Sequence, residues 1–334
     1  MKKRILACVL VLILALVTML SGCSKSDEND MITVRLCEVT HSIFYAPQYV
    51  AIAKGFFEQE NIEIELSNGG GADKVMSAVI SNSVDIGLAG PEASVYVYNS
   101  GSEDYPEVFA QLTACDGSFL VAREPDPDFK WTDLAGKHIL PGRVGGMPYM
   151  AFRYAMEENG LNPDTDANLD NTIQFDMMTG AFLSGTGDYV TMFEPVASSV
   201  QLEGKGYIVA SVGAAAGEMP YTAYFAKKSY ISQNSDLIQR FTNAVTKGQK
   251  WVQEHTPEEI AECVKEFFAD TDVTLLASAV KSYKDIGAFA TTPVMTEDAF
   301  NRLQEVIQRA GELDSAAPFD KLINNTFAEK ATTN

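Results

Sequence analysis

Apolar and polar positions alternate along several short segments of this chain. Segments 32–36 and 62–66 carry apolar residues at every second position, a pattern typical of strands with one buried face. Segment 47–54 begins with a proline and ends before a glycine, which predicts a helix. Segment 84–88 is a short apolar run and predicts a buried strand. The first third of the chain therefore predicts alternating strands and helices, an order typical of a parallel sheet covered by helices on both faces.

A turn rich in proline and aspartate at 124–128 interrupts this order, and we expect it to be the entry to a second lobe. The strands expected after the turn are segments 137–140, 173–175, 189–193, 207–212 and 221–226. The glycine-rich segment 213–217 is a candidate return crossing. From Ser229 onward the pattern is helical, and one long helix is expected around 237–251.

The N-terminal segment has a different pattern. Three cations near the start precede an apolar stretch over residues 5–20, and the run Leu-Ser-Gly-Cys ends at Cys23. The stretch is short for a spanning helix, which needs about 20 apolar residues, and its order resembles a bacterial lipoprotein signal peptide. We expect residues 1–22 to be this signal peptide, Cys23 to carry the lipid and residues 23–31 to be a flexible tether. The protein is then anchored on the outer face of the cytoplasmic membrane, with an uncleaved signal anchor as the alternative.

The charge of the chain excludes some partners. Its formal net charge is −20, and removal of the three signal-peptide cations makes it −23. Such a charge argues against binding to nucleic acid or directly to anionic lipid. It does not argue against a small anion, because a few aimed backbone amides can override the global field locally.

The cysteines do not suggest a metal centre. Cys8 leaves with the signal peptide and Cys23 is the anchor, so Cys37, Cys115 and Cys263 remain, widely spaced and without a CxxC motif. We expect no metal, no cofactor and buried free thiols. One disulfide with a leftover thiol is the alternative outside the cell.

Three loops of the sequence lie between the end of a strand and the start of a helix. They cover residues 40–45, 89–92 and 142–147. In an open parallel sheet, ligands bind beyond the carboxyl ends of the strands, where helix N-termini offer free amides and partial positive charge. The loops therefore predict a ligand site between two lobes. The candidate ligand-binding residues are His41, Ser42, Tyr45, Gly90, Glu92, Asp116, Gly145, Gly146, Met147 and Glu194.

These candidates have different expected roles. The backbone amides of residues 145–147 would bind an anionic or carbonyl group, and Tyr45 would stack on a flat ring. Glu92 and Glu194 would accept hydrogen bonds from ligand nitrogen. The glycine loop can also have a purely steric reason, His41 can be an ordinary loop histidine, and Glu194 can simply stabilise the start of a helix. No Ser-His-Asp, Cys-His or paired-carboxylate arrangement is visible at readable spacing, so we expect no catalytic site.

Several motifs, taken in order, resemble one known family. Segment 41–66, HSIFYAPQYVAIAKGFFEQENIEIEL, resembles the opening of the sulfonate, taurine, nitrate and thiamine-precursor receptors of ABC importers. VDIG at 84–87, DLAGK at 133–137 and the stretch 187–195 from Gly-Asp to Glu-Pro follow in the family's order. Together with the lipoprotein signal, this resemblance spans nearly the whole mature chain.

The resemblance implies a type II periplasmic-binding-protein fold. Two α/β lobes would be joined by crossings near 118–123 and 213–221, with the ligand between them. Residues 32–118 plus 222–334 would form lobe one, and residues 119–221 would form lobe two. The implied partners are a permease and an ATPase, and we expect a monomer.

The resemblance leaves the ligand open. A small flat nitrogenous solute such as a thiamine-type pyrimidine is favoured, and an alkylsulfonate, taurine or nitrate-type anion is the alternative. A pyrimidine-precursor enzyme on the same fold is a third hypothesis. The fungal pyrimidine synthase of this superfamily carries a CCCFC motif, which the chain lacks. A surface sensor or adhesin that uses the cleft for signalling is a fourth.

Overall fold

The computed structural model describes residues 31–333, so the expected signal peptide, the lipidation site Cys23 and nearly all of the tether lie outside the described residues. The strands are β1 Ile32–Glu38, β2 Ile62–Asn68, β3 Ile86–Ala89, β4 Pro106–Gln111, β5 Ser118–Ala122, β6 His138–Leu140, β7 Asn168–Leu169, β8 Tyr189–Phe193, β9 Tyr207–Ser211 and β10 Ala223–Lys227. The α-helices are α2 Ala46–Ala53, α3 Ala72–Ile80, α4 Glu92–Asn99, α5 Met147–Glu158, α6 Met178–Leu183, α7 Val196–Leu202, α8 Val212–Ala216, α9 Lys228–Gln233, α10 Ser235–Glu254, α11 Pro257–Val264, α12 Val273–Asp285, α13 Glu297–Arg309, α14 Phe319–Leu322 and α15 Thr326–Thr332. Short 3-10 helices are η1 Ile43–Tyr45, η2 Glu58–Glu60, η3 Trp131–Leu134, η4 Phe175–Met177 and η5 Lys265–Phe268.

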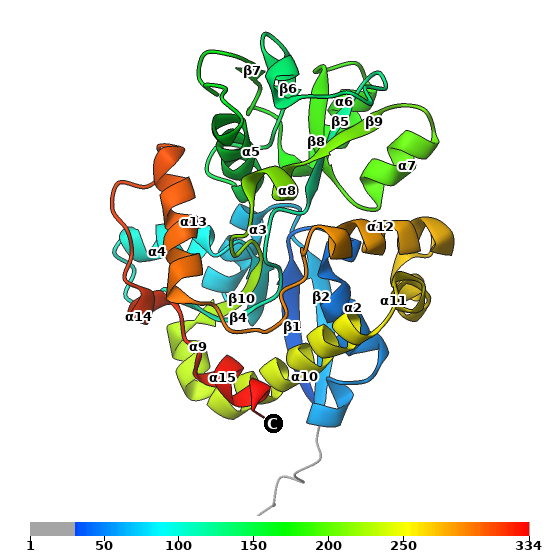
Figure 1. Cartoon of the computed structure of the whole chain (residues 1–334). Coiled ribbons are helices and arrows are strands. Elements are labelled where there is room, and N and C mark those ends of the chain that lie inside the picture. Colours follow the sequence, from blue (N-terminus) through cyan, green and yellow to red (C-terminus); the bar gives the residue numbers. More distant parts are fainter. Residues whose placement is uncertain (1–30, 334) are drawn as a thin grey trace, which may run out of the picture. The chain divides into compact units, whose positions relative to one another are not determined.

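The strands form two sheets, each flanked by helices (Figure 1). The first sheet has the order β2-β1-β3-β10-β4 and the second has the order β7-β6-β8-β5-β9. We call the part built on the first sheet lobe one and the part built on the second sheet lobe two. Both belong to one compact unit that begins at Thr33.

Each sheet is mixed, with one strand that runs antiparallel to its neighbours. β1 and β3 are parallel, but β10 runs antiparallel to β3 and β4. In the second sheet β6 is parallel to β7 and β8, whereas β5 is antiparallel to β8 and β9. β5 and β10 are the strands that the chain enters directly from the other sheet. They therefore start at the edge where the parallel strands end, which reverses their direction.

The prediction of a strand over 173–175 is wrong. The chain turns at Asp170, whose Oδ1 accepts hydrogen bonds from the backbone N and the hydroxyl of Thr172 at 3.1 and 2.6 Å. This Asx turn ends the pairing with β6 after the two-residue strand β7, and Phe175 instead begins η4. Likewise the expected strand 207–212 ends at Ser211, whose hydroxyl caps α8 by accepting from Ala214 N at 3.2 Å.

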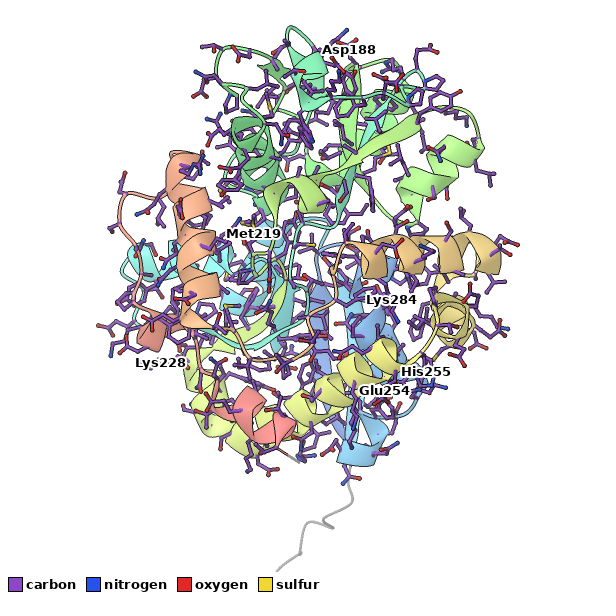
Figure 2. The ribbon with its side chains drawn as sticks, viewed as in Figure 1. Asp188, Met219, Lys228, Glu254, His255 and Lys284 are labelled. Carbon is purple, nitrogen blue, oxygen red and sulfur yellow. The ribbon has the colours of Figure 1, made fainter. Side chains whose placement is uncertain are left out.

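The two crossings between the sheets, 112–117 and 212–222, are hydrogen-bonded to each other. The first lies before the expected position near 118–123, because those residues form β5. Thr113 N donates to Thr222 O at 3.2 Å, and Thr222 N donates to the hydroxyl of Thr113 at 2.9 Å. Met219 N, in the return crossing, donates to Ala114 O at 2.8 Å, and Met219 lies between the two sheets (Figure 2). Ala114 N in turn donates to Ala288 O at 2.8 Å, so a third segment, which follows α12, is hydrogen-bonded to the first crossing. The carboxyl ends of β3 and β8 are held beside these crossings.

The long helix α10 covers lobe one and packs against α2 and α15. Its buried side chains recur at helical spacing, as the sequence pattern predicted. Its last turn is closed by Lys284 of α12, whose Nζ donates to Val252 O at 2.9 Å and His255 O at 2.6 Å. Lys284, His255 and the exposed Glu254 lie together at this end of the helix (Figure 2).

The three cysteines of the described part are free thiols. Cys37 and Cys115 are buried, as expected, but Cys263 is only half-buried. Among residues 31–333, no helix is both long and apolar enough to cross a bilayer.

α10 packs tightly against α2 at Gly248. A Cβ at this position would overlap Pro47 O and lie 3.0 Å from the Cβ of Ala51. We therefore predict that Gly248→Ala lowers the free energy of unfolding by about 1–3 kcal/mol, because the two helices must separate. Urea unfolding followed by circular dichroism measures this change.

Gly180 in α6 provides the matched control, because nothing lies within 4 Å of a Cβ placed there. Gly180→Ala should be neutral or stabilising by up to about 1 kcal/mol, since alanine favours the helix. Equal unfolding free energies for Gly248→Ala and the unmodified protein would contradict the proposed close contact.

Candidate functional site

A cavity of about 50 Å³ lies where the carboxyl ends of strands from both sheets meet. It is lined by Val39, Thr40, Tyr45, Gly71, Ala72, Gly90, Glu92, Arg143, Gly146, Met147, Pro148, Phe175, Phe193, Tyr221 and Thr222. Both lobes contribute to this lining, so a ligand enclosed here must enter while the lobes are apart.

Three helices begin at this cavity. α3 starts after Gly71, α4 starts at Glu92 and α5 starts after Gly146, and each of these residues lines the cavity. The first N–H groups of a helix lack partners within the helix and carry partial positive charge. The cavity therefore has the electrostatic character of an anion-binding site, modified by its own side chains.

Four aromatic side chains supply most of the flat surface of the cavity. Tyr45 comes from η1, Phe175 from η4, Phe193 from the end of β8 and Tyr221 from the return crossing. The ring centroids of Phe175 and Phe193 are 5.7 Å apart, and those of Phe193 and Tyr221 are 6.3 Å apart. Such rings can enclose a flat apolar or heteroaromatic group.

Glu92 is the buried acid of the cavity. It is 2% exposed, and its Oε2 makes no hydrogen bond. Its carboxylate folds back over Gly90, where a Cβ would overlap it. Burial raises the pKa of Glu92 to about 7, although Arg143 and the backbone N–H of Met147 act in the opposite direction. Glu92 thus holds a buried acceptor that a ligand can use.

Tyr221 offers a second unpaired polar atom. Its hydroxyl is buried and makes no hydrogen bond of good geometry. Asp116 lies nearby, and burial raises the pKa of its carboxyl to about 6. Asp116 Oδ1 accepts from Ser118 N at 2.6 Å, while its Oδ2 is unpaired. Buried polar atoms without partners are rare in proteins, so those of Glu92 and Tyr221 at one cavity suggest groups that a ligand satisfies.

The structure divides the ten candidates from the sequence into two groups. The residues that line the cavity are Tyr45, Gly90, Glu92, Gly146 and Met147. The residues that do not line it are His41, Ser42, Asp116, Gly145 and Glu194. Gly145 instead borders an outer groove beside Asp73 and Glu312.

His41 is an exposed residue outside the cavity lining, and it bonds to the buried acid Glu38. Its Nδ1 lies 3.0 Å from Glu38 Oε1 and its Nε2 lies 2.7 Å from Phe267 O. Glu38 also accepts from the Tyr49 hydroxyl at 2.9 Å and from Gln48 Nε2 at 2.8 Å. Burial raises the pKa of Glu38, whereas hydrogen bonding to Glu38 raises the pKa of His41. His41 therefore supports the loop before η1 instead of facing the cavity.

Glu194 and Ser42 connect the lobes. The Ser42 hydroxyl donates to Glu194 O at 2.6 Å, and Glu194 N donates to the Tyr283 hydroxyl at 2.9 Å. The Glu194 carboxylate accepts from Ser198 N at 2.9 Å and from its hydroxyl at 2.6 Å. Both carboxylate oxygens are thus used at the start of α7, which matches the structural alternative considered for Glu194.

Sequence reasoning missed most of the aromatic lining. Phe193 precedes Glu194, and because side chains alternate along a strand, only one of the two can face the cavity. The alternation along β8 was the signal that could have found Phe193. Gly71 follows β2 and precedes α3, so the rule used for the other three loops also applies to it. Phe175 had no comparable signal, because it lies in η4, far from any glycine loop.

Two ion pairs join the lobes near the cavity. Arg143 lies 3.2 Å from Asp73, and Lys74 lies 3.1 Å from Asp176. Exposed pairs of this kind contribute only about 0–1 kcal/mol each. They favour the closed arrangement weakly, which leaves room for a ligand to control closure.

A larger groove of about 1050 Å³ lies on the surface between α10, α11 and α12. Lys54, Trp251, His255 and Cys263 are among the residues that line it. No strand residue is among its lining, and none of the described side-chain atoms that are buried without partners belongs to it. The smaller cavity is therefore the better candidate site.

Comparison with known proteins agrees with this architecture. Residues 43–260 match the family described as NMT1/THI5 like. The chain belongs to the NMT1/THI5-like family. This family member is 41% identical over 314 residues to YtlA of Bacillus subtilis (strain 168), which is named as a candidate binding protein, and the match covers 94% of the present chain and 93% of YtlA.

Solved structures establish the fold of this NMT1/THI5-like protein. The alkanesulfonate-binding protein SsuA from Xanthomonas axonopodis pv. citri, bound to MOPS, superposes with a TM-score of 0.73 at 12% identity over 89% of this chain and 99% of SsuA. The periplasmic nitrate-binding protein NrtA from Synechocystis PCC 6803 gives 0.69 at 17% identity over 90% and 88%. The two-lobed α/β periplasmic-binding-protein fold expected from the sequence is confirmed.

The buried carboxyl of Glu92 predicts a pH dependence of stability. Its pKa is about 7 in the folded protein but 4.5 in an exposed carboxyl, so the unfolded chain loses this proton first as the pH rises. This group therefore lowers stability progressively between about pH 4.5 and pH 7, by roughly 3 kcal/mol in full. Glu92→Gln should raise the free energy of unfolding at pH 8 by about 2–3 kcal/mol and change it little at pH 4.

Urea unfolding at the two pH values measures this difference. Glu254→Gln, an exposed Glu-to-Gln change, should show no such dependence. A Glu92→Gln effect of the same size at pH 4 and pH 8 would show that the side chain acts by packing instead of ionisation.

Proposed function

We propose that this protein is the extracytoplasmic substrate-binding component of an ABC importer. It captures a small flat nitrogenous solute, with a thiamine-type pyrimidine favoured, by closing its two lobes around it. The observation that carries this proposal is the small aromatic-lined cavity between the sheets, which contains the unpaired buried oxygen of Glu92. Family membership and the name of YtlA as a candidate binding protein support it.

The chemistry of the cavity favours a ring that carries hydrogen-bond donors. Tyr45, Phe193 and Tyr221 can hold a flat group, and Glu92 Oε2 can accept from an amine or a protonated ring nitrogen. A non-catalytic receptor needs only these contacts and a hinge, and the crossings around Thr113 and Thr222 provide a place for the hinge.

An anion is the second candidate ligand. The helix N-termini of α3, α4 and α5 favour it, and SsuA and NrtA are named as alkanesulfonate- and nitrate-binding proteins. The negative charge of Glu92 disfavours it. Mass spectrometry of compounds that co-purify, followed by a thermal-shift screen of pyrimidines, sulfonates and nitrate, distinguishes the two classes.

The proposed cellular setting follows from the same role. Lipid on Cys23 would hold the receptor at the outer face of the membrane, where a permease and an ATPase would take up the solute from a monomeric receptor. Metabolic labelling with a fatty acid analogue in a bacterial host, compared with Cys23→Ser, tests the anchor. Reversible one-to-one binding without conversion of the solute would dismiss the hypothesis of a pyrimidine-precursor enzyme.

Tyr221→Phe tests the ligand contact with little structural disturbance. The hydroxyl makes no hydrogen bond of good geometry in the protein, and the neighbouring Asp116 keeps its bond from Ser118 N, so removal of the hydroxyl should disturb the fold little. We predict that Tyr221→Phe weakens binding of a 4-aminopyrimidine about tenfold, the effect of one buried hydrogen bond. Isothermal titration calorimetry measures the dissociation constant.

Tyr207→Phe is the control, because Tyr207 lies in β9 and does not line the cavity. It should bind like the unmodified protein. Unchanged affinity in Tyr221→Phe would remove this hydroxyl from the site, and the absence of binding by the unmodified protein to any pyrimidine in the screen would count against the proposed ligand class.

A further inference from the structure

The carboxylate of Glu92 occupies the place that an anionic ligand would take. Glu92 is the first residue of α4, and its carboxylate lies back over Gly90 at the start of that helix. The backbone N–H of Met147, at the start of α5 in the other lobe, also interacts with this carboxylate and lowers its pKa. The charge that two helix N-termini attract is thus supplied by the protein itself.

One oxygen of this carboxylate is left over. Glu92 is only 2% exposed and lines the cavity, and its Oε2 is buried over Gly90 without a hydrogen-bond partner. A side chain that served only the helix start would leave no buried oxygen unpaired. The free oxygen points to a donor that arrives with the ligand.

We propose that Glu92 determines ligand specificity by acting as a built-in anion at the N-termini of α4 and α5. The cavity then accepts solutes that present an N–H donor or a positive charge to Oε2, and it rejects sulfonates and nitrate. This inference rests on the proposed receptor function, and it adds the residue that selects the charge of the solute.

The surrounding groups do not cancel this charge. Arg143 lines the cavity, but its guanidinium is shared with Asp73 at 3.2 Å. The hydroxyl-bearing residues that line the cavity are neutral at physiological pH; they are Thr40, Tyr45, Tyr221 and Thr222. Further acids near the site are Asp116, beside Tyr221, and Glu312, which borders the adjoining groove with Arg143. An incoming anion would therefore meet a carboxylate with only partial compensation, a repulsion that corresponds to roughly 100-fold or more in affinity.

The test compares the unmodified protein with Glu92→Gln and Glu92→Ala at pH 8, where the carboxyl is mainly ionised. The probes are a 4-aminopyrimidine, ethanesulfonate and nitrate, each titrated by calorimetry against chloride as the background anion. Glu92→Ala should bind ethanesulfonate or nitrate at least tenfold more tightly than the unmodified protein, because the helix amides become free. Glu92→Gln should bind the 4-aminopyrimidine at least tenfold more weakly, because Oε2 loses its charge while the shape is kept.

Glu254→Gln is the control and should keep the binding profile of the unmodified protein, because Glu254 is exposed at the end of α10 (Figure 2). Circular dichroism and thermal unfolding verify that each variant is folded, and Glu92→Gln still tests the charge if Glu92→Ala does not fold.

The outcomes separate this inference from the proposed function. Gain of anion binding by Glu92→Ala supports the inference even if no pyrimidine binds, in which case only the proposed ligand class fails. If both variants bind the 4-aminopyrimidine and the anions with the same affinities as the unmodified protein, the inference is overturned and the receptor function stays intact. Tight binding of ethanesulfonate by the unmodified protein, or no anion binding by any variant, also overturns it.

Discussion

The hydrogen-bonded contact between the two crossings is the constraint on which the rest of the structure depends. Thr113 and Thr222 bond to each other through both side chains and backbone. Gly213 allows the second crossing to approach the first, because a Cβ there would overlap the carbonyl of Asp116. This contact brings the carboxyl ends of β3 and β8 to one place. The cavity, its three helix N-termini and the reversed directions of β5 and β10 are all consequences.

Local patterns predicted most strands and helices, but they did not predict strand direction. The alternation in β1 and β2 is a property of neighbouring residues, so it is visible in the sequence. The direction of β10 depends on the end of the sheet at which the return crossing arrives. The residues near β10 do not determine this. The early end of β7 depends on one side-chain hydrogen bond at Asp170, which favours a turn over a strand. The pattern of apolar positions contains no information on such a bond.

The candidate site was predictable at the level of loops and less so at the level of side chains. The rule that ligands bind beyond the carboxyl ends of strands led to Tyr45, Glu92 and Met147. It could not decide between Phe193 and Glu194, because a shift of one residue along a strand exchanges the two faces. Phe175 comes from η4, and its ring contacts Phe193 within lobe two, a contact between residues far apart in the sequence that no local pattern predicts.

The burial of Glu92 connects recognition to closure. While the lobes are apart, water can hydrate its carboxylate, and closure without a ligand removes that water and leaves Oε2 unpaired. A solute that donates to Oε2 replaces the lost hydration only in the closed state, so its binding energy is directed to that state. A ligand without such a donor does not replace the water that the Glu92 carboxylate loses, so closure around it costs free energy. The few weak ion pairs between the lobes, such as Lys74 with Asp176, are too exposed to override this penalty. The same carboxylate that selects the solute therefore also makes closure conditional on the solute.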